Sequence, residues 1–282
     1  MSRQGSAIEV KERAFQAELF ADPVPELTTL RGFCVLASSS GGNCSALVHG
    51  EGKLKRITLI DAGLSPRRTR YFLAQVGLSI ELVDDVLFTH FDTDHCYNGW
   101  GGKFPRHTRI HAHARHRSRA RWFDLPADRT NFFEGDFELR GGLRVTTILQ
   151  SHDEDGVIAF RFDAPTGGSL GYATDLGRAG QRLHDALRGV DTLAIESNYC
   201  PKMQLASTRP EYLKRRIMGG AGHLSNEQCR DAVREIAPKS RVVLLHLSRE
   251  CNHPELAASY HANAPYGVVV SRPDQPTELF QL

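Results

Sequence analysis

Four potential metal ligands crowd into one short segment of the chain. Directly after an apolar run at residues 86–88, six positions hold His90, Asp92, Asp94 and His95. Imidazoles and carboxylates this close together cost free energy unless a cation compensates them, because like charges repel and buried polar groups need partners. Ligands spaced this way on a tight loop cannot all reach one ion. The spacing therefore predicts two ions, one served by His90 and Asp92 and the other by Asp94 and His95.

Three more candidate ligands lie at the ends of later apolar runs. His152 follows the run that ends at Leu149, Asp175 follows residues 172–174, and His246 follows residues 242–245. Each alone could be a hydrogen-bonded strand end. Polar residues just past successive strands nevertheless tend to meet at one rim of a fold, so we expect all three to join the same site.

The elements that must position these residues are short strands and helices. Alternating and apolar runs predict strands at 33–37, 46–49, 57–60 and 86–89, a basic strand and helix at 109–122, then strands at 145–149, 158–162 and 170–174. Helix, strand, helix, helix and strand follow through His246. This order favours a sheet-on-sheet core covered by helices, with the site at one rim. Ser225 and Gln228 predict a capping box at the start of one helix.

Composition indicates an ordinary globular chain with local basic patches. The 282 residues carry a formal net charge of +2, so a polyanionic substrate would have to be attracted locally. Residues 106–121 hold six arginines and four histidines, and residues 214–216 form a second basic cluster. The first stretch is either a solvated face or a nucleic-acid groove.

The rest of the composition bears on compartment and domain organisation. Six scattered cysteines without a Cys-x-x-Cys motif predict reduced thiols. Apolar runs too short for a bilayer, and an amino-terminal segment without a signal-peptide core, predict a cytoplasmic protein with no membrane partner. Residues 1–30 are expected to form an appendage and linker, and residues 31–282 a single metallo-hydrolase domain. The oligomeric state is left open.

Several local segments carry a family resemblance. They are the 90–95 cluster, Ala-Ser-Ser-Ser-Gly-Gly-Asn-Cys at 37–44, Ser-His-Asp at 151–153, Ala-Thr-Asp at 173–175, Gly-His-Leu-Ser-Asn-Glu at 222–227 and His-Leu-Ser-Arg-Glu-Cys-Asn at 246–252. Together they resemble the metallo-beta-lactamase fold superfamily, and within it the nuclease-like branch of YycJ/WalJ-type proteins and, more distantly, ribonuclease Z. The resemblance implies an α/β fold, a four-layer αββα sandwich.

The resemblance also implies how the ligands divide between two divalent ions of zinc, manganese or iron. It places His90, Asp92 and His152 at the first ion, Asp94, His95 and His246 at the second, and Asp175 as a bridge between them. Asp92 stands where the family usually has histidine. A hard carboxylate oxygen at that position favours manganese or iron over zinc at the first ion, relative to the usual motif.

A shared metal pair suggests a hydrolytic mechanism. Two divalent ions can lower the pKa of a bridging water from about 15.7 toward about 7, which supplies hydroxide as a nucleophile at neutral pH and suits phosphodiesters. By resemblance, His223 paired with Glu196 donates the proton to the leaving oxygen. Asp61 is expected to orient a ligand.

Simpler interpretations of three of these features stay open. His223 could be a surface residue at the entry of the helix capped by Ser225, and Asp61 could be only a turn former. The segment 38–43 could be a hairpin turn or a loop whose free N–H groups let a phosphate or the metal centre approach.

The leading functional interpretation is a dinuclear metal-dependent phosphodiesterase or nuclease acting on a phosphodiester or nucleic-acid substrate, with Asp94, His223 and Glu196 as catalytic residues. A small-molecule hydrolase of the same fold, acting on a cyclic phosphodiester, thioester or lactone, is the main alternative because fold does not choose the substrate. A di-iron redox protein is a third interpretation, although the segment after His246 is too short for a flavin-binding domain. A binding module with a decayed site is the fourth.

Overall fold

The computed structural model describes residues 27–152 and 154–282. Most of the appendage expected at residues 1–30 lies outside this part of the chain. The first strand begins at Thr29, so the last two residues of the expected linker already belong to a sheet.

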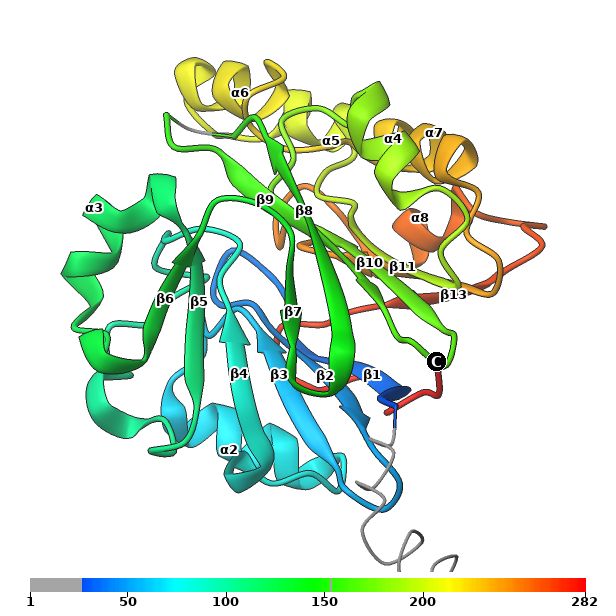
Figure 1. The fold of residues 1–282 in the computed structure, drawn as a ribbon. Coiled ribbons are helices and arrows are strands. Elements are labelled where there is room, and N and C mark those ends of the chain that lie inside the picture. Colours follow the sequence, from blue (N-terminus) through cyan, green and yellow to red (C-terminus); the bar gives the residue numbers. More distant parts are fainter. Residues whose placement is uncertain (1–26, 153) are drawn as a thin grey trace, which may run out of the picture.

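Two mixed sheets pack face to face in the described chain (Figure 1). The first has the order β1-β2-β3-β4-β5-β6 and the second the order β13-β12-β11-β10-β9-β8-β7. The strands of the first sheet are β1 (Thr29–Ala37), β2 (Cys44–Gly50), β3 (Arg56–Ile60), β4 (Val83–Leu87), β5 (Arg109–His113) and β6 (Thr130–Phe133). Those of the second are β7 (Phe137–Leu139), β8 (Leu143–Gln150), β9 (Val157–Asp163), β10 (Ser169–Ala173), β11 (Thr192–Glu196), β12 (Arg241–Leu245) and β13 (Gly267–Val270).

The helices cover the outer faces of the sheets and one rim. They are α2 (Pro66–Gln75), α3 (Arg117–Ala120), α4 (Gln181–Leu187), α5 (Pro201–Ala206), α6 (Glu211–Met218), α7 (Asn226–Ile236) and α8 (Pro254–Ser259). Helix α2 lies on the first sheet, α4 and α7 lie on the second, and α3 and α6 stand apart at the rim (Figure 1).

Alternation along the strands builds the layers. In β1, Phe33 and Val35 belong to the apolar cluster between the two sheets, whereas Cys34 and Leu36 belong to the cluster under α2. This period of two is what a strand buried on both faces requires. A third cluster joins the second sheet to α4 and α7. The predicted α/β fold, a four-layer αββα sandwich, is confirmed.

Parallel pairing brings strand ends to one edge. Strands β3 and β4 are parallel neighbours, as are β10, β11 and β12. The carboxyl ends of parallel neighbours share an edge, so the residues that follow these strands meet. The predicted site at one rim thus follows from the sheet topology.

Some predicted boundaries were wrong. The strand predicted at 86–89 ends at Leu87, because the Thr89 amide donates to the Asp61 carboxylate at 2.8 Å instead of to a neighbouring strand. Three helices, not two, separate β11 from β12, and α2 was not predicted. The capping box was right: Gln228 N donates to Ser225 Oγ at 3.2 Å, and Ser225 N donates to Gln228 Oε1 at 2.8 Å.

All six cysteines are described, buried and free, which confirms the prediction of thiols. Among the described helices, none is both long and apolar enough to cross a bilayer.

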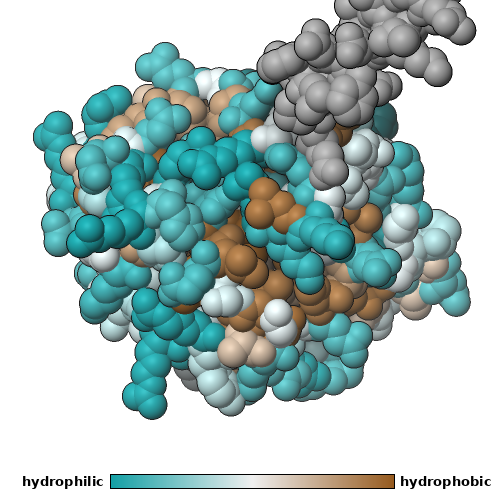
Figure 2. All heavy atoms as spheres, turned by 60° about the horizontal axis from the view of Figure 1, so that its bottom comes forward, coloured by the Kyte–Doolittle hydropathy of each residue, from teal (hydrophilic) through white to brown (hydrophobic). Residues whose placement is uncertain are grey.

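The surface carries scattered large hydrophobic side chains. Figure 2 shows one mainly hydrophilic face with hydrophobic residues gathered near its middle. In the described chain the exposed large hydrophobic residues are Leu27, Leu54, Tyr71, Tyr97, Trp122, Leu205, Tyr212 and Leu279. Trp122 is the most exposed of these, at 84%.

Candidate metal centre

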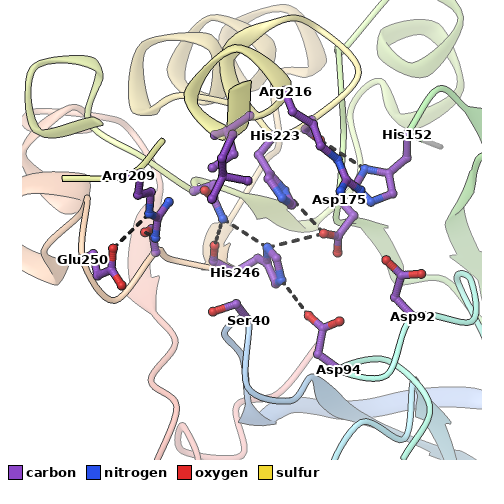
Figure 3. Close-up of a pocket in the computed structure, with 15 residues that line it drawn as sticks. Ser40, Asp92, Asp94, His152, Asp175, Arg209, Arg216, His223, His246 and Glu250 are labelled. Atoms are coloured by element: carbon purple, nitrogen blue, oxygen red, sulfur yellow. Dashed lines mark hydrogen bonds and ion pairs between the residues drawn. The ribbon is translucent and has the colours of Figure 1, made fainter. Parts of the chain in front are cut away.

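The predicted ligands converge on one cavity at the shared edge of the strands. The loop after β4 carries four of them, and His152, Asp175 and His246 follow β8, β10 and β12. The cavity has a volume of about 450 Å³ (Figure 3). The predicted ligands that line it are Asp92, Asp94, His152, Asp175 and His246. The structure therefore brings together residues from both halves of the chain.

The ligand atoms fall into groups small enough to hold an ion. Within each group they lie within 4.8 Å of one another, and two of the groups are His90 with Asp92 and His152, and Asp94 with His95 and His246. Asp175 forms a further group with His90 and His95, one residue from each of these two groups. Its Oδ2 is 2.8 Å from His95 Nε2, and its Oδ1 is 3.5 Å from His246 Nδ1.

Three of these strand ends adopt left-handed backbone conformations. Asp61, Asp175 and His246 have φ values of 61°, 52° and 55°. Such values are uncommon outside glycine and cost free energy, so they persist only where the surroundings hold them. The His246 amide is held by Ser38 Oγ, which accepts its hydrogen bond at 2.8 Å.

Asp61 contacts the imidazole of His95. Its Oδ2 accepts from His95 Nδ1 at 2.7 Å, and its carboxylate also accepts from the amide and hydroxyl of Thr89. Burial raises the pKa of Asp61, while the contacts with His95 and Thr89 oppose that rise. The contact leaves His95 Nε2 facing the centre, which is how a carboxylate prepares an imidazole to bind a metal. Asp61 also has a left-handed backbone conformation directly after β3, so the chain turns at this residue as well.

Asp92 has a partner that the sequence did not reveal. Arg119 Nη1 donates to Asp92 Oδ1 at 2.7 Å, while Asp92 Oδ2 lies 3.9 Å from His90 Nε2. One carboxylate oxygen is thus engaged by a guanidinium, and the other faces the ligands. The two residues are 27 positions apart in the sequence. The stretch around Arg119 was singled out from the sequence only for its positive charge.

The donor set fits divalent cations. His90 Nε2 is buried and has no hydrogen-bond partner in the described chain. Burial, then His95, hold the pKa of His90 well below its usual value, which leaves a neutral imidazole with a free lone pair. Burial also opposes a charge on His246, yet Asp175, Asp94 and Glu196 outweigh it and raise the pKa of His246 to about 10. The three carboxylates that stabilise a proton on His246 would also stabilise a bound metal cation.

His223 and Glu196 form a pair at the cavity wall. Glu196 Oε1 lies 2.7 Å from His223 Nδ1 and 3.1 Å from His246 Nδ1. Its Oε2 accepts from the amides of Leu176 and Leu224 at 2.8 and 3.2 Å. Glu196 is fully buried, whereas the His223 side chain is 20% exposed and lines the cavity (Figure 3). His223 therefore faces the site instead of the outer surface.

The comparison with protein families decides the membership. The model of the beta-lactamase superfamily domain matches residues 56–247. The chain belongs to this superfamily. It is a hydrolase of the metallo-beta-lactamase type, a fold that generally binds divalent metals.

Individual relatives agree with that membership. The chain is 30% identical over 235 residues to the protein named exodeoxyribonuclease YycJ of Bacillus anthracis, covering 80% of this chain and 85% of the relative. It is 28% identical over 269 residues to the exodeoxyribonuclease WalJ of Streptococcus pneumoniae, covering 89% and 97%. The solved metallo-beta-lactamase fold protein YhfI of Bacillus subtilis matches 89% of this chain and all of its own chain, with a TM-score of 0.65 and 16% identity. The predicted likeness to the YycJ/WalJ branch is confirmed.

Two asparagines support the centre of this superfamily hydrolase. Asn43 Nδ2 lies 3.3 Å from Asp94 Oδ2 and 3.0 Å from His95 Nε2. Asn198 Nδ2 donates to the His246 carbonyl at 2.6 Å. The segment 38–43 joins β1 to β2, so it is a hairpin connection that also contacts the ligands. The small residues of segment 38–43 had pointed to this loop in the sequence. Nothing in the sequence had pointed to Asn198.

Two arginines also line the cavity. Arg209 Nε donates to Glu250 Oε2 at 2.9 Å, and its Nη2 lies 3.3 Å from Ser248 Oγ. Arg216, from the basic cluster at 214–216, lies on the same wall as His223 (Figure 3). Arg216 had been noted in the sequence as part of the basic cluster at 214–216. Arg209 had not been noted.

Proposed function

We propose that this superfamily hydrolase is a dinuclear metal-dependent phosphodiesterase that acts as a nuclease on DNA. The observation that carries the proposal is the place of Asp175 between two ligand groups, beside the His223–Glu196 pair. The names of the relatives, exodeoxyribonucleases, support the same substrate class.

The ligand groups support the division that the family pattern implies. His90, Asp92 and His152 would hold one divalent ion, Asp94, His95 and His246 would hold the other, and Asp175 would serve both. His152 Nδ1 donates to the Gly222 carbonyl at 3.1 Å, which directs its Nε2 toward the centre. When bound, zinc, manganese or iron supplies hydroxide near neutral pH and neutralises charge on the substrate oxygens.

His223 gives the proton that the leaving oxygen needs. Glu196 accepts from His223 Nδ1 and stabilises the charged imidazolium, so that His223 Nε2–H can be donated into the cavity. The two backbone amides that bind Glu196 hold its carboxylate in place. Because Glu196 occupies Nδ1 of His223, the proton can be donated to the leaving oxygen only from Nε2.

The arginines bind the substrate phosphates. Glu250 and Ser248 hold the guanidinium of Arg209 in position before substrate arrives, which lowers the cost of ordering it. A fixed, planar donor array suits phosphate oxygens. Arg216 adds a second positive charge on the same wall.

Hydrolysis of a small panel tests the proposal. Protein reconstituted with zinc, manganese or iron is given thymidine monophosphate p-nitrophenyl ester, bis(p-nitrophenyl) phosphate, a lactone and a thioester. We expect preference for the nucleotide ester. Exclusive cleavage of the lactone or thioester would overturn the proposal.

A small-molecule hydrolase is the second candidate. A cavity of about 450 Å³ lies in the lower part of the range for small-ligand pockets, which favours a compact substrate such as a cyclic phosphodiester. The same panel with a cyclic dinucleotide added separates the two. Iron with oxygen uptake would indicate redox chemistry, and lack of metal binding would indicate a decayed site.

A further inference from the structure

The two oxygens of the Asp92 carboxylate have different surroundings. Arg119 Nη1 donates to Asp92 Oδ1 at 2.7 Å, whereas Asp92 Oδ2 lies 3.9 Å from His90 Nε2. In an ionised carboxylate the two oxygens are chemically equivalent, so either one or both can bind a metal. The contact with Arg119 removes this equivalence, because it engages Oδ1 and leaves Oδ2 on the side of His90.

A second carboxylate contacts the guanidinium of Arg119. Arg119 Nε lies 3.4 Å from Asp155 Oδ2. Since Nε and Nη1 belong to one planar group, contacts at both nitrogens fix the orientation of that plane as well as its position. The guanidinium therefore meets Asp92 in a defined geometry.

The helical turns around α3 position Arg119. The ring centroids of Phe123 and Phe91 lie 5.5 Å apart, and both side chains are buried. His116 Nε2 donates to the Gly156 carbonyl at 2.8 Å, which ties the same turns to the loop after β8. Packing against the loops that follow β4 and β8 thus sets the position of the guanidinium, and these two loops carry the ligands assigned to the first ion.

The ion pair of Arg119 with Asp92 adds little to the stability of the fold. The Arg119 side chain is 38% exposed and the Asp92 side chain 36%. Water screens an ion pair with this exposure, and ordering the two side chains costs entropy. Support of the core is therefore a poor explanation for a contact built this closely.

A carboxylate with one oxygen engaged offers a metal the same number of donors as an imidazole. His90 and His152, which are grouped with Asp92, each supply one nitrogen and no charge when neutral. Asp92 supplies one oxygen, and the guanidinium offsets its negative charge. A second oxygen from Asp92 would add a donor and a charge. Manganese, with its higher coordination number, accepts such an addition better than zinc, which prefers four ligands.

We propose that Arg119 is a positioning residue that restricts Asp92 to one ligand oxygen and offsets its charge, and that it thereby sets which divalent ion this group prefers. The inference rests on the ligand assignment of the proposed function and is independent of the substrate. Removal of the guanidinium would release Asp92 Oδ1 and an uncompensated charge. The preference of this group for manganese over zinc should then rise.

Metal titration of the full chain tests the proposal. Protein stripped with chelator is titrated with manganese and with zinc, and the binding step that Asp92→Ala loses is assigned to the first ion. In Arg119→Ala we expect the ratio of the manganese to the zinc association constant for this step to rise by about tenfold. The step assigned to the second ion should not change. Arg121→Ala is the matched control, because it removes the same charge from an exposed position two residues along.

Cobalt(II) absorption reports on the number of donors. The visible bands of cobalt(II) weaken as its coordination number rises from four to six, so they follow the geometry of the ion and not the stability of the fold. Arg119→Ala and Arg119→Met should both weaken the band of the first ion. In a chain that also carries Asp92→His, Arg119→Ala should leave the band unchanged, since an imidazole supplies one donor whatever its neighbour.

Thermal unfolding in the presence of chelator measures any structural role of Arg119. Arg119→Ala should lower Tm by no more than about 3 °C, as expected for a partly exposed ion pair. Arg119→Met keeps the stem of the side chain and removes every donor, so it repeats the metal titration without the loss of packing that alanine brings.

The outcomes separate this inference from the proposed function. If the unaltered chain binds two equivalents of metal, and Arg119→Ala has the same metal preference and cobalt bands, the positioning role is wrong and the nuclease proposal stands. An equal spectral change with and without Asp92→His also overturns the role, because the effect would not pass through Asp92. Fewer than two equivalents in the unaltered chain contradict both proposals. A shifted preference in a chain that cleaves no phosphodiester supports the positioning role and contradicts the nuclease.

Discussion

Glu196 accepts a hydrogen bond from His223 at 2.7 Å, and the same carboxylate oxygen lies 3.1 Å from His246. A buried carboxylate therefore links the proposed proton donor to a proposed metal ligand. Because only His246 is assigned to the metal, the two histidines should respond differently to substitution.

His223→Ala is expected to lower kcat by about 100-fold or more, since a positioned general acid contributes about that much. Bound metal should stay at the level of the unaltered chain. Steady-state kinetics together with elemental analysis of the purified variant check both points. Loss of metal from His223→Ala would reassign this residue as a ligand.

Asp94→Ala is expected to abolish hydrolysis with little loss of fold, because the Asp94 side chain contacts the site and not the core. The metal content should fall from two equivalents toward one. Elemental analysis and thermal unfolding in the presence of chelator measure the two effects. Unchanged turnover of a phosphodiester by Asp94→Ala or by His95→Ala would contradict the ligand assignment.

Gly63→Ala should destabilise the loop that carries Asp94. A Cβ at Gly63 would lie 1.8 Å from the Asp94 carbonyl oxygen, a backbone atom that cannot move aside alone. We expect a loss of about 1–3 kcal/mol in the free energy of unfolding and weaker metal binding.

Gly180→Ala is the control for this steric effect, since no atom lies within 4 Å of its added Cβ. Denaturant unfolding and a metal titration compare the two variants. If Gly63→Ala and Gly180→Ala behave alike, close packing at Asp94 is not the cause.

Arg209→Ala should raise KM for a nucleotide ester by about tenfold, with a smaller effect on kcat, because a hydrogen bond to a charged group is lost on binding. Arg209→Lys should recover only part of the loss, since lysine lacks the planar fork. Arg182→Ala, which removes an exposed arginine on α4, serves as the control. An unchanged KM for Arg209→Ala would remove this residue from phosphate binding.

Acid should destabilise the fold in part through His49, which lies in β2 away from the site. Burial is the main cause that lowers the pKa of His49 from 6.5 to about 4. The unfolded chain therefore takes up a proton below pH 6.5 that the folded chain refuses until about pH 4. Stability present above pH 6.5 is lost as pH falls, on the order of 2 kcal/mol at pH 5.

Urea unfolding at pH 7.5 and pH 5 measures this effect. His49→Gln removes the titrating group and can keep a hydrogen bond to Thr58 Oγ1, which lies 2.9 Å from His49 Nε2. The loss of stability between the two pH values should be smaller in the variant. The same loss in both chains would assign the acid sensitivity to other groups.

The sequence predicted the candidate ligands because their signal is local. A polar residue directly after an apolar run marks a strand end, and His246 and Asp175 were found in this way. The layers followed from alternation along strands such as β1. These features depend on residues that are close together in the sequence, so they can be predicted from a single sequence.

The residues that were missed depend on contacts between distant segments. Arg119 meets Asp92 where Phe123 packs on Phe91, and nothing in the basic stretch distinguishes Arg119 from the arginines around it. Asn198 reaches His246 because β11 and β12 are parallel neighbours. Such contacts are set by tertiary packing, which spacing along the chain does not encode.

Anomalous diffraction from crystals grown with manganese or zinc tests the central claim most directly. Two peaks are expected on either side of the Asp175 carboxylate, one within reach of His90, Asp92 and His152 and the other within reach of Asp94, His95 and His246. A single peak, or peaks outside this cavity, would contradict a shared dinuclear centre.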